Sequence, residues 1–227
     1  MPEKLIAFGD VHLNWQAARV ILDHARKEEV NKALTLGDEG YKIYPFGTGE
    51  QEEYDKLYHE IRTFRNEKPK RILICIKGDK TVTVPPDLFV NFVGFDDQGK
   101  NIGSVIFHED NIIAGHSGKW ILEEHEELIK DYQGYEPLIV FHGHSHSMGV
   151  LPTYKWLQDD EKVHWLPNSE EVYNLEPRNV YWVNPGGNFM RGPDGTHYAN
   201  FSIYDPEQQI VTLRTIVFDQ NKISPSK

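Results

Sequence analysis

Short runs of apolar residues alternate with segments of helical spacing over the first part of the chain, and strand-like runs dominate the last part. The runs that predict buried strands are 5–8, 33–36, 71–76, 88–95, 104–107, 111–114, 138–141, 180–183, 198–204 and 209–216. Apolar residues recur at helical spacing in the segments 18–25, 54–61 and 121–129, which predicts three amphipathic helices, the first capped by Asn14. This order predicts an α/β fold with parallel βα units first, an antiparallel portion last, and helices on the outer faces of one or two sheets.

The organisation along the chain predicts one domain. No internal repeat, low-complexity tract or linker rich in Pro, Gly and Ser divides the 227 residues, so we expect a single domain over 1–221. Residues 152–179 carry four aromatic residues and three prolines among charged side chains, and we interpret them as a long irregular insertion. Residues 222–227 are expected to form a disordered tail.

Composition disfavours several classes of protein. No apolar run approaches the roughly 20 residues of a membrane helix, and the mean hydropathy is -0.57, so we expect no membrane partner. The one cysteine, Cys75, lies in an apolar run, which excludes a disulfide scaffold and a cysteine-based zinc site. The amino terminus carries no recognisable export signal, so we expect a cytoplasmic protein. The net charge of -11 disfavours broad, sequence-independent nucleic-acid binding.

Five apolar runs end in a glycine joined to an aspartate or a histidine. The side chains at these ends are Asp10, Asp38, Asp79, His116 and His144, and the first and last motifs add His12 and His146 two positions further on. Because ligand sites form at the carboxyl ends of strands in an open α/β sheet, we expect the seven side chains to converge on one edge, with glycine permitting a sharp turn. The i, i+2 spacing in D-x-H and H-x-H points both side chains to one side of an extended backbone. Three carboxylates and four imidazoles exceed the needs of one tetrahedral ion and fit two ions that share a bridging carboxylate.

Each motif taken alone has an ordinary structural explanation. A single Gly-Asp pair after a strand is usually a turn, but five such motifs in strand order are hard to attribute to turns, and clustered acids without cations would repel one another. We interpret the other histidines as structural or solvated: His24, His59, His108, His125, His164 and His197. His142, inside an apolar strand, is interpreted as a buried, hydrogen-bonded histidine and not as a ligand.

The order and spacing of these motifs resemble those of the calcineurin-like metallophosphoesterase family. Its D-x-H, G-D, lone-histidine and G-H-x-H motifs match Gly-Asp10-Val-His12, Gly37-Asp38, His116 and Gly143-His144-Ser145-His146. Asn184-Pro-Gly-Gly and the strand at 198–205 are similar to the small bacterial and archaeal phosphodiesterase-like branch. The resemblance implies a two-sheet β-sandwich flanked by helices, a four-layer α/β/β/α fold. It also implies that Asp10, His12, Asp38 and His146 hold one metal and that Asp38, Asp79, His116 and His144 hold the other, with Asp38 bridging.

One motif departs from the family pattern. Where the family has Gly-Asn-His followed by an acid, this chain reads Gly78-Asp79-Lys80-Thr81. Asp79 keeps an oxygen donor for the metal. Lys80 replaces an imidazole that helps stabilise the transition state or protonate the leaving oxygen in the family. An ammonium near cations can stabilise negative charge or, with a lowered pKa, donate a proton, whereas the alternative is a solvated turn residue.

The leading hypothesis is a metal-dependent phosphoesterase, with a phosphodiesterase favoured. It would hydrolyse a small phosphoester such as a nucleotide by in-line attack of a hydroxide that bridges two divalent metals. The mixed donor set favours Mn, Fe, Co, Ni or Zn over Mg or Ca, and manganese is our first choice. A set of aromatic residues either stacks a base of the substrate or only packs: Trp156, Trp165, Tyr173, Tyr181 and Trp182.

Two other hypotheses belong to different classes. Lys80 is the feature that favours a catalytically degenerate scaffold, which keeps the metallophosphoesterase fold and binds a protein partner. A mononuclear zinc protein that uses the H-x-H and one aspartate would leave two strand-end acids unexplained. A count of the metals bound per chain distinguishes the mononuclear from the dinuclear hypothesis.

Overall fold

A computed structural model describes residues 3–38, 48–69, 71–76, 107–146, 148–151, 169–188 and 196–226 of the protein. The predicted strand at 88–95 and residues 152–168 of the predicted insertion lie outside this part of the chain.

The first sheet has six strands in the order β3-β2-β1-β10-β11-β8. Its members are β1 (Leu5–Phe8), β2 (Lys32–Thr35), β3 (Ile72–Cys75), β8 (Glu170–Asn174), β10 (His197–Asp205) and β11 (Ile210–Phe218). β1, β2 and β3 run parallel, whereas β10 pairs antiparallel with β1 and continues antiparallel through β11 to β8. The predicted order, parallel units first and antiparallel strands last, is confirmed in this sheet.

The second sheet has five strands in the order β4-β5-β6-β9-β7. Its members are β4 (Phe107–Glu109), β5 (Ile112–Gly115), β6 (Leu138–His142), β7 (Met148–Leu151) and β9 (Val180–Pro185). β5, β6 and β9 run parallel, and the edge strands β4 and β7 run antiparallel to their neighbours. Because β5 and β6 are parallel, their carboxyl ends lie at the same edge of the sheet.

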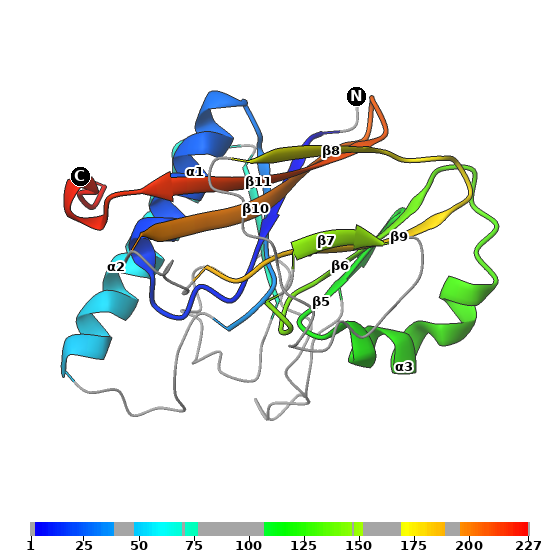
Figure 1. Ribbon diagram of the computed structural model, residues 1–227, viewed down its shortest axis with the longest axis horizontal. Coiled ribbons are helices and arrows are strands. Elements are labelled where there is room, and N and C mark those ends of the chain that lie inside the picture. The colour runs from blue at the N-terminus through cyan, green and yellow to red at the C-terminus, as the bar shows by residue number, and fades with distance from the viewer. Residues whose placement is uncertain are drawn as a thin grey trace.

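In the described part of the chain, three α-helices cover the outer faces of the two sheets (Figure 1). α1 (Trp15–Lys27) and α2 (Thr48–Asn66) pack on the first sheet, and α3 (Gly118–Lys130) packs on the second. The predicted cap of the first helix is confirmed, because the Asn14 side chain accepts a hydrogen bond from the backbone N–H of Ala17 at 3.1 Å. No helix in the described ranges is both long and apolar enough to span a bilayer.

The alternation of side chains along each strand builds separate cores on its two faces. In β1, Ile6 and Phe8 pack toward the helices, whereas Leu5 and Ala7 pack toward the second sheet. In β5, Ile113 packs toward α3 while its neighbours Ile112 and Ala114 pack toward the first sheet. These two strands are therefore buried on both faces, and the four-layer α/β/β/α order is confirmed.

Part of the predicted irregular insertion is regular. β8 lies within 152–179 and pairs with β11 as an edge strand of the first sheet, with Tyr173 opposite Val211. Three of its side chains are glutamate or asparagine and Val172 is 52% exposed, so the segment lacks the apolar run by which we predicted strands.

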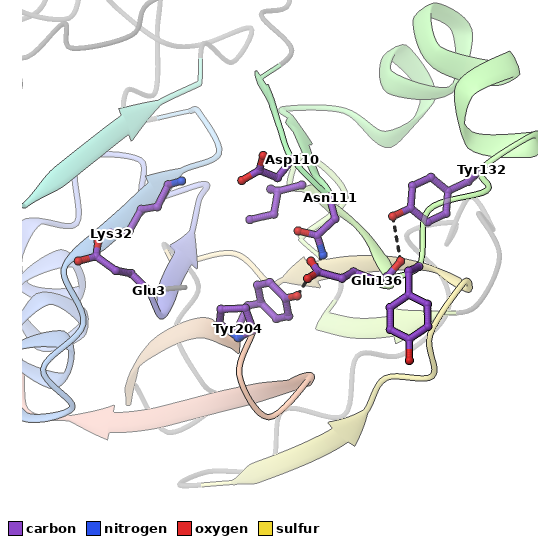
Figure 2. Close-up of a pocket in the computed structure, with 10 residues that line it drawn as sticks. Glu3, Lys32, Asp110, Asn111, Tyr132, Glu136 and Tyr204 are labelled. Atoms are coloured by element: carbon purple, nitrogen blue, oxygen red, sulfur yellow. Dashed lines mark hydrogen bonds between the residues drawn. The ribbon is translucent and has the colours of Figure 1, made fainter. Parts of the chain in front are cut away.

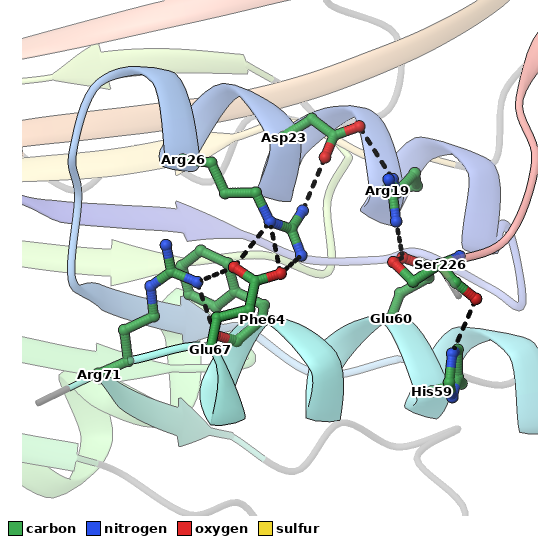
Figure 3. Close-up of polar contacts among 9 residues, drawn as sticks. All are labelled: Arg19, Asp23, Arg26, His59, Glu60, Phe64, Glu67, Arg71 and Ser226. Carbon is green, nitrogen blue, oxygen red and sulfur yellow. Dashed lines mark hydrogen bonds and ion pairs between the residues drawn. The ribbon is translucent and has the colours of Figure 1, made fainter. Parts of the chain in front are cut away.

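The carboxyl-terminal residues lie against α2 (Figure 3). A short 3₁₀ helix, Gln220–Lys222, is followed by an extended segment that ends at Ser226 in the described chain. The backbone N–H and hydroxyl of Ser226 donate to the carboxylate of Glu60 at 2.6 and 2.7 Å, and Arg19 of α1 donates to the same carboxylate at 3.0 Å. Glu60 is fully buried. The three donors satisfy both oxygens of its carboxylate, and the Arg19 guanidinium compensates its negative charge.

Candidate metal centre

The expected ligands are carried by the loops that follow β1, β2, β5 and β6. The backbone N–H of Asp10 donates to the carbonyl of Gly37 at 3.0 Å, and that of His12 donates to the carbonyl of Asp38 at 2.9 Å. The loops after β1 and β2 are thereby joined beyond the ends of their strands. Asp79 and Lys80, which follow β3 in the sequence, lie outside the described residues.

Six of the seven predicted ligands form two groups of three. The first cluster is Asp10, His12 and His146, and the second cluster is Asp38, His116 and His144; within each, one possible ligand atom per residue lies within 4.8 Å of the others. In the first, His146 Nε2 lies 3.4 Å from Asp10 Oδ1. In the second, His116 Nε2 lies 3.4 Å from Asp38 Oδ2 and 3.1 Å from His144 Nδ1.

Each cluster takes ligands from both sheets. Asp10, His12 and Asp38 follow strands of the first sheet, whereas His116, His144 and His146 follow strands of the second. The site is therefore built where the edges of two sheets meet, and not at one edge of a single sheet as the sequence alone suggests.

The chemistry of the donors fits divalent cations. Asp10 and Asp38 are 0% and 1% exposed, and burial of two neighbouring carboxylates is unfavourable unless positive charge compensates them. His116 Nδ1 lies 2.8 Å from the carbonyl oxygen of Leu36, and since a carbonyl can only accept, Nδ1 carries the proton. In the neutral ring Nε2 then presents a lone pair toward the cluster, which is the arrangement that a metal-binding histidine needs.

Five of the six cluster residues have left-handed backbone conformations. The values of φ are 50° for Asp10, 44° for His12, 55° for Asp38, 67° for His144 and 54° for His146. Such conformations cost about 1–3 kcal/mol each in residues other than glycine, and they persist where the surrounding structure holds them.

The neighbouring glycines serve mainly a different purpose from the one we predicted. Gly37 does have a positive φ of 93°, but the close approach of other groups explains Gly9 and Gly143. A Cβ on Gly9 would lie 2.8 Å from Cβ of Leu36, and a Cβ on Gly143 would lie 2.6 Å from Oδ2 of Asp10. The two glycines therefore leave room for the second loop and for the Asp10 carboxylate.

Comparisons with known proteins decide the fold. No family model and no curated protein matches the chain. Among solved structures, the chain is similar to a metallophosphoesterase from Sphaerobacter thermophilus, with 16% sequence identity, a TM-score of 0.54, and coverage of 96% of this chain and 90% of that one. The protein has the metallophosphoesterase fold. The expected resemblance is thus confirmed at the level of the fold.

Two further solved structures align at lower scores. YfcE, a phosphoesterase from E. coli, is 13% identical with a TM-score of 0.45, over 89% of this chain and 88% of that one. An archaeal phosphodiesterase is 16% identical with a TM-score of 0.43, over 95% of this chain and 99% of that one.

Within this metallophosphoesterase fold, His142 is a buried histidine, as the sequence suggested. It is 9% exposed, its ring contacts Trp182 at a centroid distance of 5.9 Å, and its Nδ1 lies 3.4 Å from the carbonyl of Gly143. Burial lowers the pKa of His142 to about 4, so the ring is neutral near pH 7.

The three aromatic residues singled out from the sequence that the structure describes, Tyr173, Tyr181 and Trp182, do not line the two clusters. Trp182 is 3% exposed and packs in the core between the second sheet and α3, while Tyr173 and Tyr181 pack against the core between the sheets. Trp156 and Trp165 lie outside the described residues.

Trp120 is the aromatic residue that the sequence reasoning missed. It lies in the first turn of α3, half-buried, with its ring centroid 6.1 Å from that of His116 and 6.2 Å from that of His144. Its position four residues after the strand-end His116, in the helix that follows, was the available signal. Trp120 provides a flat apolar surface beside the second cluster.

A cavity of about 580 Å³ lies at the opposite edge of the sandwich (Figure 2). Lys32 at the start of β2 and Ile112 at the start of β5 help to line it, so it lies at the amino ends of the parallel strands. None of its lining residues belongs to either cluster of potential metal ligands in the described chain. The cavity is therefore separate from the two clusters of candidate metal ligands.

Proposed function

We propose that this protein is a metal-dependent phosphoesterase that binds two divalent ions. The observation that carries the proposal is the pair of adjoining three-residue clusters at the carboxyl ends of strands from both sheets. The fold supports it, because the similar structure from Sphaerobacter thermophilus is a metallophosphoesterase.

The residues divide between the two proposed ions. Asp10, His12 and His146 would hold the first ion, and His116 and His144 the second, with Asp38 shared between them and Asp79 completing the second set. When bound, the ions supply positive charge for the phosphoryl oxygens and lower the pKa of water, so that it attacks phosphorus near neutral pH. The donors are a mixture of imidazole and carboxylate, which favours Mn, Fe, Co, Ni or Zn, and manganese is the ion of first choice.

The proposed ions and the residues around them suit an anionic substrate. Two divalent cations would offset four of the eleven net negative charges of the chain at the position where a phosphate must approach. The His146 side chain is 28% exposed, so the first cluster is open to solvent. Trp120 offers a stacking surface for a flat group next to the second cluster. A phosphodiester that carries a nucleobase fits these features best.

Hydrolysis of bis(p-nitrophenyl) phosphate by metal-stripped protein, with and without added manganese, tests the proposal. Because nitrophenolate leaves without a proton, the assay does not depend on the family histidine that this chain lacks. Manganese-dependent turnover supports the proposal. Absence of turnover when metal analysis finds both sites filled would reject it in favour of a scaffold that binds a protein partner.

Lys80 is proposed to assist departure of the leaving group. A proton donor matters most when the leaving alcohol is a poor one. We expect Lys80→Ala to reduce kcat/KM for an alkyl phosphodiester more than for a p-nitrophenyl ester. Equal losses for both substrates would restrict Lys80 to an electrostatic role.

A further inference from the structure

The turn at residues 184–188, which comprises the last two residues of β9 and the three after it, contacts loops of both sheets. Asn184 Nδ2 donates to Ser145 Oγ at 2.9 Å, in the loop that carries His144 and His146. Four residues further on, Asn188 contacts the loop that carries Asp10 and His12. The turn therefore joins the parts of the chain that form the first cluster.

Asn188 holds the loop at 9–14 at both of its ends. It is fully buried; its backbone N–H donates to the carbonyl of Asp10 at 3.0 Å, and its Nδ2 donates to the carbonyl of Gly9 at 2.9 Å. Its own carbonyl accepts a hydrogen bond from Asn14 Nδ2 at 2.7 Å. Asn14 also caps α1, so the loop is fixed between Asn188 and the start of the helix.

The side chain of Asn188 is in turn anchored in the first sheet. Its Oδ1 accepts from the backbone N–H of Asn200 in β10 at 2.6 Å, and its Nδ2 donates to the carbonyl of Asn200 at 3.0 Å. Asn200 Nδ2 donates to the carbonyl of Gly187 at 2.7 Å, and Thr215 of β11 donates to Asn200 Oδ1 at 2.9 Å. Buried networks with every partner satisfied hold one arrangement of the backbone.

His146 packs against the same turn. A Cβ on Gly187 would lie 3.0 Å from Cβ and 3.2 Å from Cγ of His146, so the backbone of Gly187 lies directly against this side chain. The backbone N–H of Gly187 faces the carbonyl of His146 at 3.4 Å. Residues 187 and 188 therefore contact His146 on one side and the Asp10 loop on the other.

We infer that Asn188 is a positioning residue that sets the spacing between Asp10, His12 and His146, and so the affinity of the first cluster for its ion. All three ligands have left-handed backbones, which require outside support of this kind. Within the described chain, no hydrogen bond of Asn188 reaches Asp38, His116 or His144. Asn188 contacts the backbone of Asp10 and not the carboxylate that accepts from His144, so we expect the main effect at the first cluster. This inference rests on the proposed metal centre.

Manganese titration of metal-stripped full-length variants tests the inference by calorimetry. His116→Ala leaves the first cluster intact, and His146→Ala leaves the second, so each background reports one site. Loss of a residue that orients metal ligands typically lowers affinity about 10–100-fold. We expect Asn188→Ala to have this effect in the His116→Ala background and to change affinity by no more than about twofold in the other.

Two further variants keep the test informative. Asn14→Ser retains a good helix cap but removes the 2.7 Å hydrogen bond to Asn188, and we expect a smaller loss at the first site only. Asn111→Ala is the matched control, since Asn111 is also buried and donates to a carbonyl, that of Pro137 at 2.7 Å, but lines the cavity at the far edge (Figure 2). It should leave both affinities unchanged.

The titrations distinguish the positioning role of Asn188 from the existence of the metal centre. Equal weakening of both sites by Asn188→Ala, or unchanged affinity at the first site in protein with native circular dichroism, would overturn the positioning role. Failure of the unsubstituted chain to bind manganese would reject the metal centre itself, and the positioning role with it.

Discussion

The backbone N–H of His144 donates to both carboxylate oxygens of Asp10, at 3.2 Å from Oδ1 and 3.0 Å from Oδ2. Asp10 follows β1 of the first sheet and His144 follows β6 of the second, so this contact joins the two sheets at the candidate centre. It also joins the two clusters, because Asp10 belongs to the first and His144 to the second. A change that displaces the Asp10 carboxylate should therefore affect both.

Gly143→Ala should displace that carboxylate. The new Cβ would lie 2.6 Å from Asp10 Oδ2, and we expect overpacking to destabilise the fold by about 1–3 kcal/mol and to weaken metal binding. Denaturant unfolding and metal analysis measure the two effects. Gly149→Ala is the control, because no atom of the described residues beyond its two chain neighbours lies within 4 Å of the corresponding position, and stability should change by less than about 0.5 kcal/mol. Similar behaviour of the two variants would contradict the packing argument.

Asp38→Ala should abolish hydrolysis and lower the metal content of both sites. The reason is that Asp38 is assigned as the shared ligand, and a remaining ion would lack its bridging oxygen. Asp55→Ala, which removes an exposed carboxylate on α2, serves as the control and should retain full activity. Metal analysis by mass spectrometry together with the bis(p-nitrophenyl) phosphate assay measures the result. Full activity of Asp38→Ala would rule out the bridging role.

Trp120→Ala should impair binding of substrates that carry a base. Stacking of a base on an aromatic ring contributes about 1–3 kcal/mol, so KM for thymidine 5′-(p-nitrophenyl phosphate) should rise about fivefold or more. Methyl p-nitrophenyl phosphate has the same leaving group without a base, and its KM should change little. Trp120→Phe should restore most of the difference. Equal changes for both substrates would show that Trp120 only packs against the histidines.

The ion pairs that Glu67, directly after α2, forms with Arg26 of α1 and with Arg71 should make stability depend on pH (Figure 3). Burial alone would raise the pKa of Glu67, but hydrogen bonds from Arg26 and Arg71 lower it below its ordinary value. A carboxyl whose pKa is lowered on folding stabilises the protein above its unfolded pKa of about 4.3, and this contribution is lost as pH falls through the folded value.

Glu67→Gln should therefore reduce the free energy of unfolding at pH 7 by about 1 kcal/mol, a value that allows for solvent screening of the 35% exposed side chain. The difference from the unsubstituted protein should shrink as pH falls from about 5 toward 3. Urea unfolding at several pH values measures it. Glu123→Gln, which removes an exposed partner of Lys119 on α3, is the control. A pH-independent difference for Glu67→Gln would contradict the ionic explanation.

The sequence was most informative where a local pattern has one physical meaning. The apolar run at 5–8 predicts β1, which spans Leu5–Phe8. The strand-end motifs include six potential ligands that the structure brings together in two clusters. Asn14 was recognisable as a cap because its side chain and the following helical spacing form a local signal.

Features that depend on contacts between distant segments were not predictable. The short edge strand β7 was missed because its four half-buried apolar residues include a glycine, which makes a weak local strand signal, and its pairing with β9, 31 to 37 residues along the chain, is not visible in the local pattern. The left-handed conformations of Asp10 and His146 are held by partners such as Asn188 and Gly187, which no spacing rule connects to them. The position of Trp120 likewise follows from how α3 packs beside His116 and His144.

Anomalous X-ray scattering at the manganese edge, from crystals of the protein grown with manganese, tests the central claim most directly. We predict two ions per chain, one bound by Asp10, His12 and His146 and one by His116 and His144, with Asp38 bound to both and Asp79 bound to the second. A single ion per chain, or two ions bound by other residues, would contradict the account.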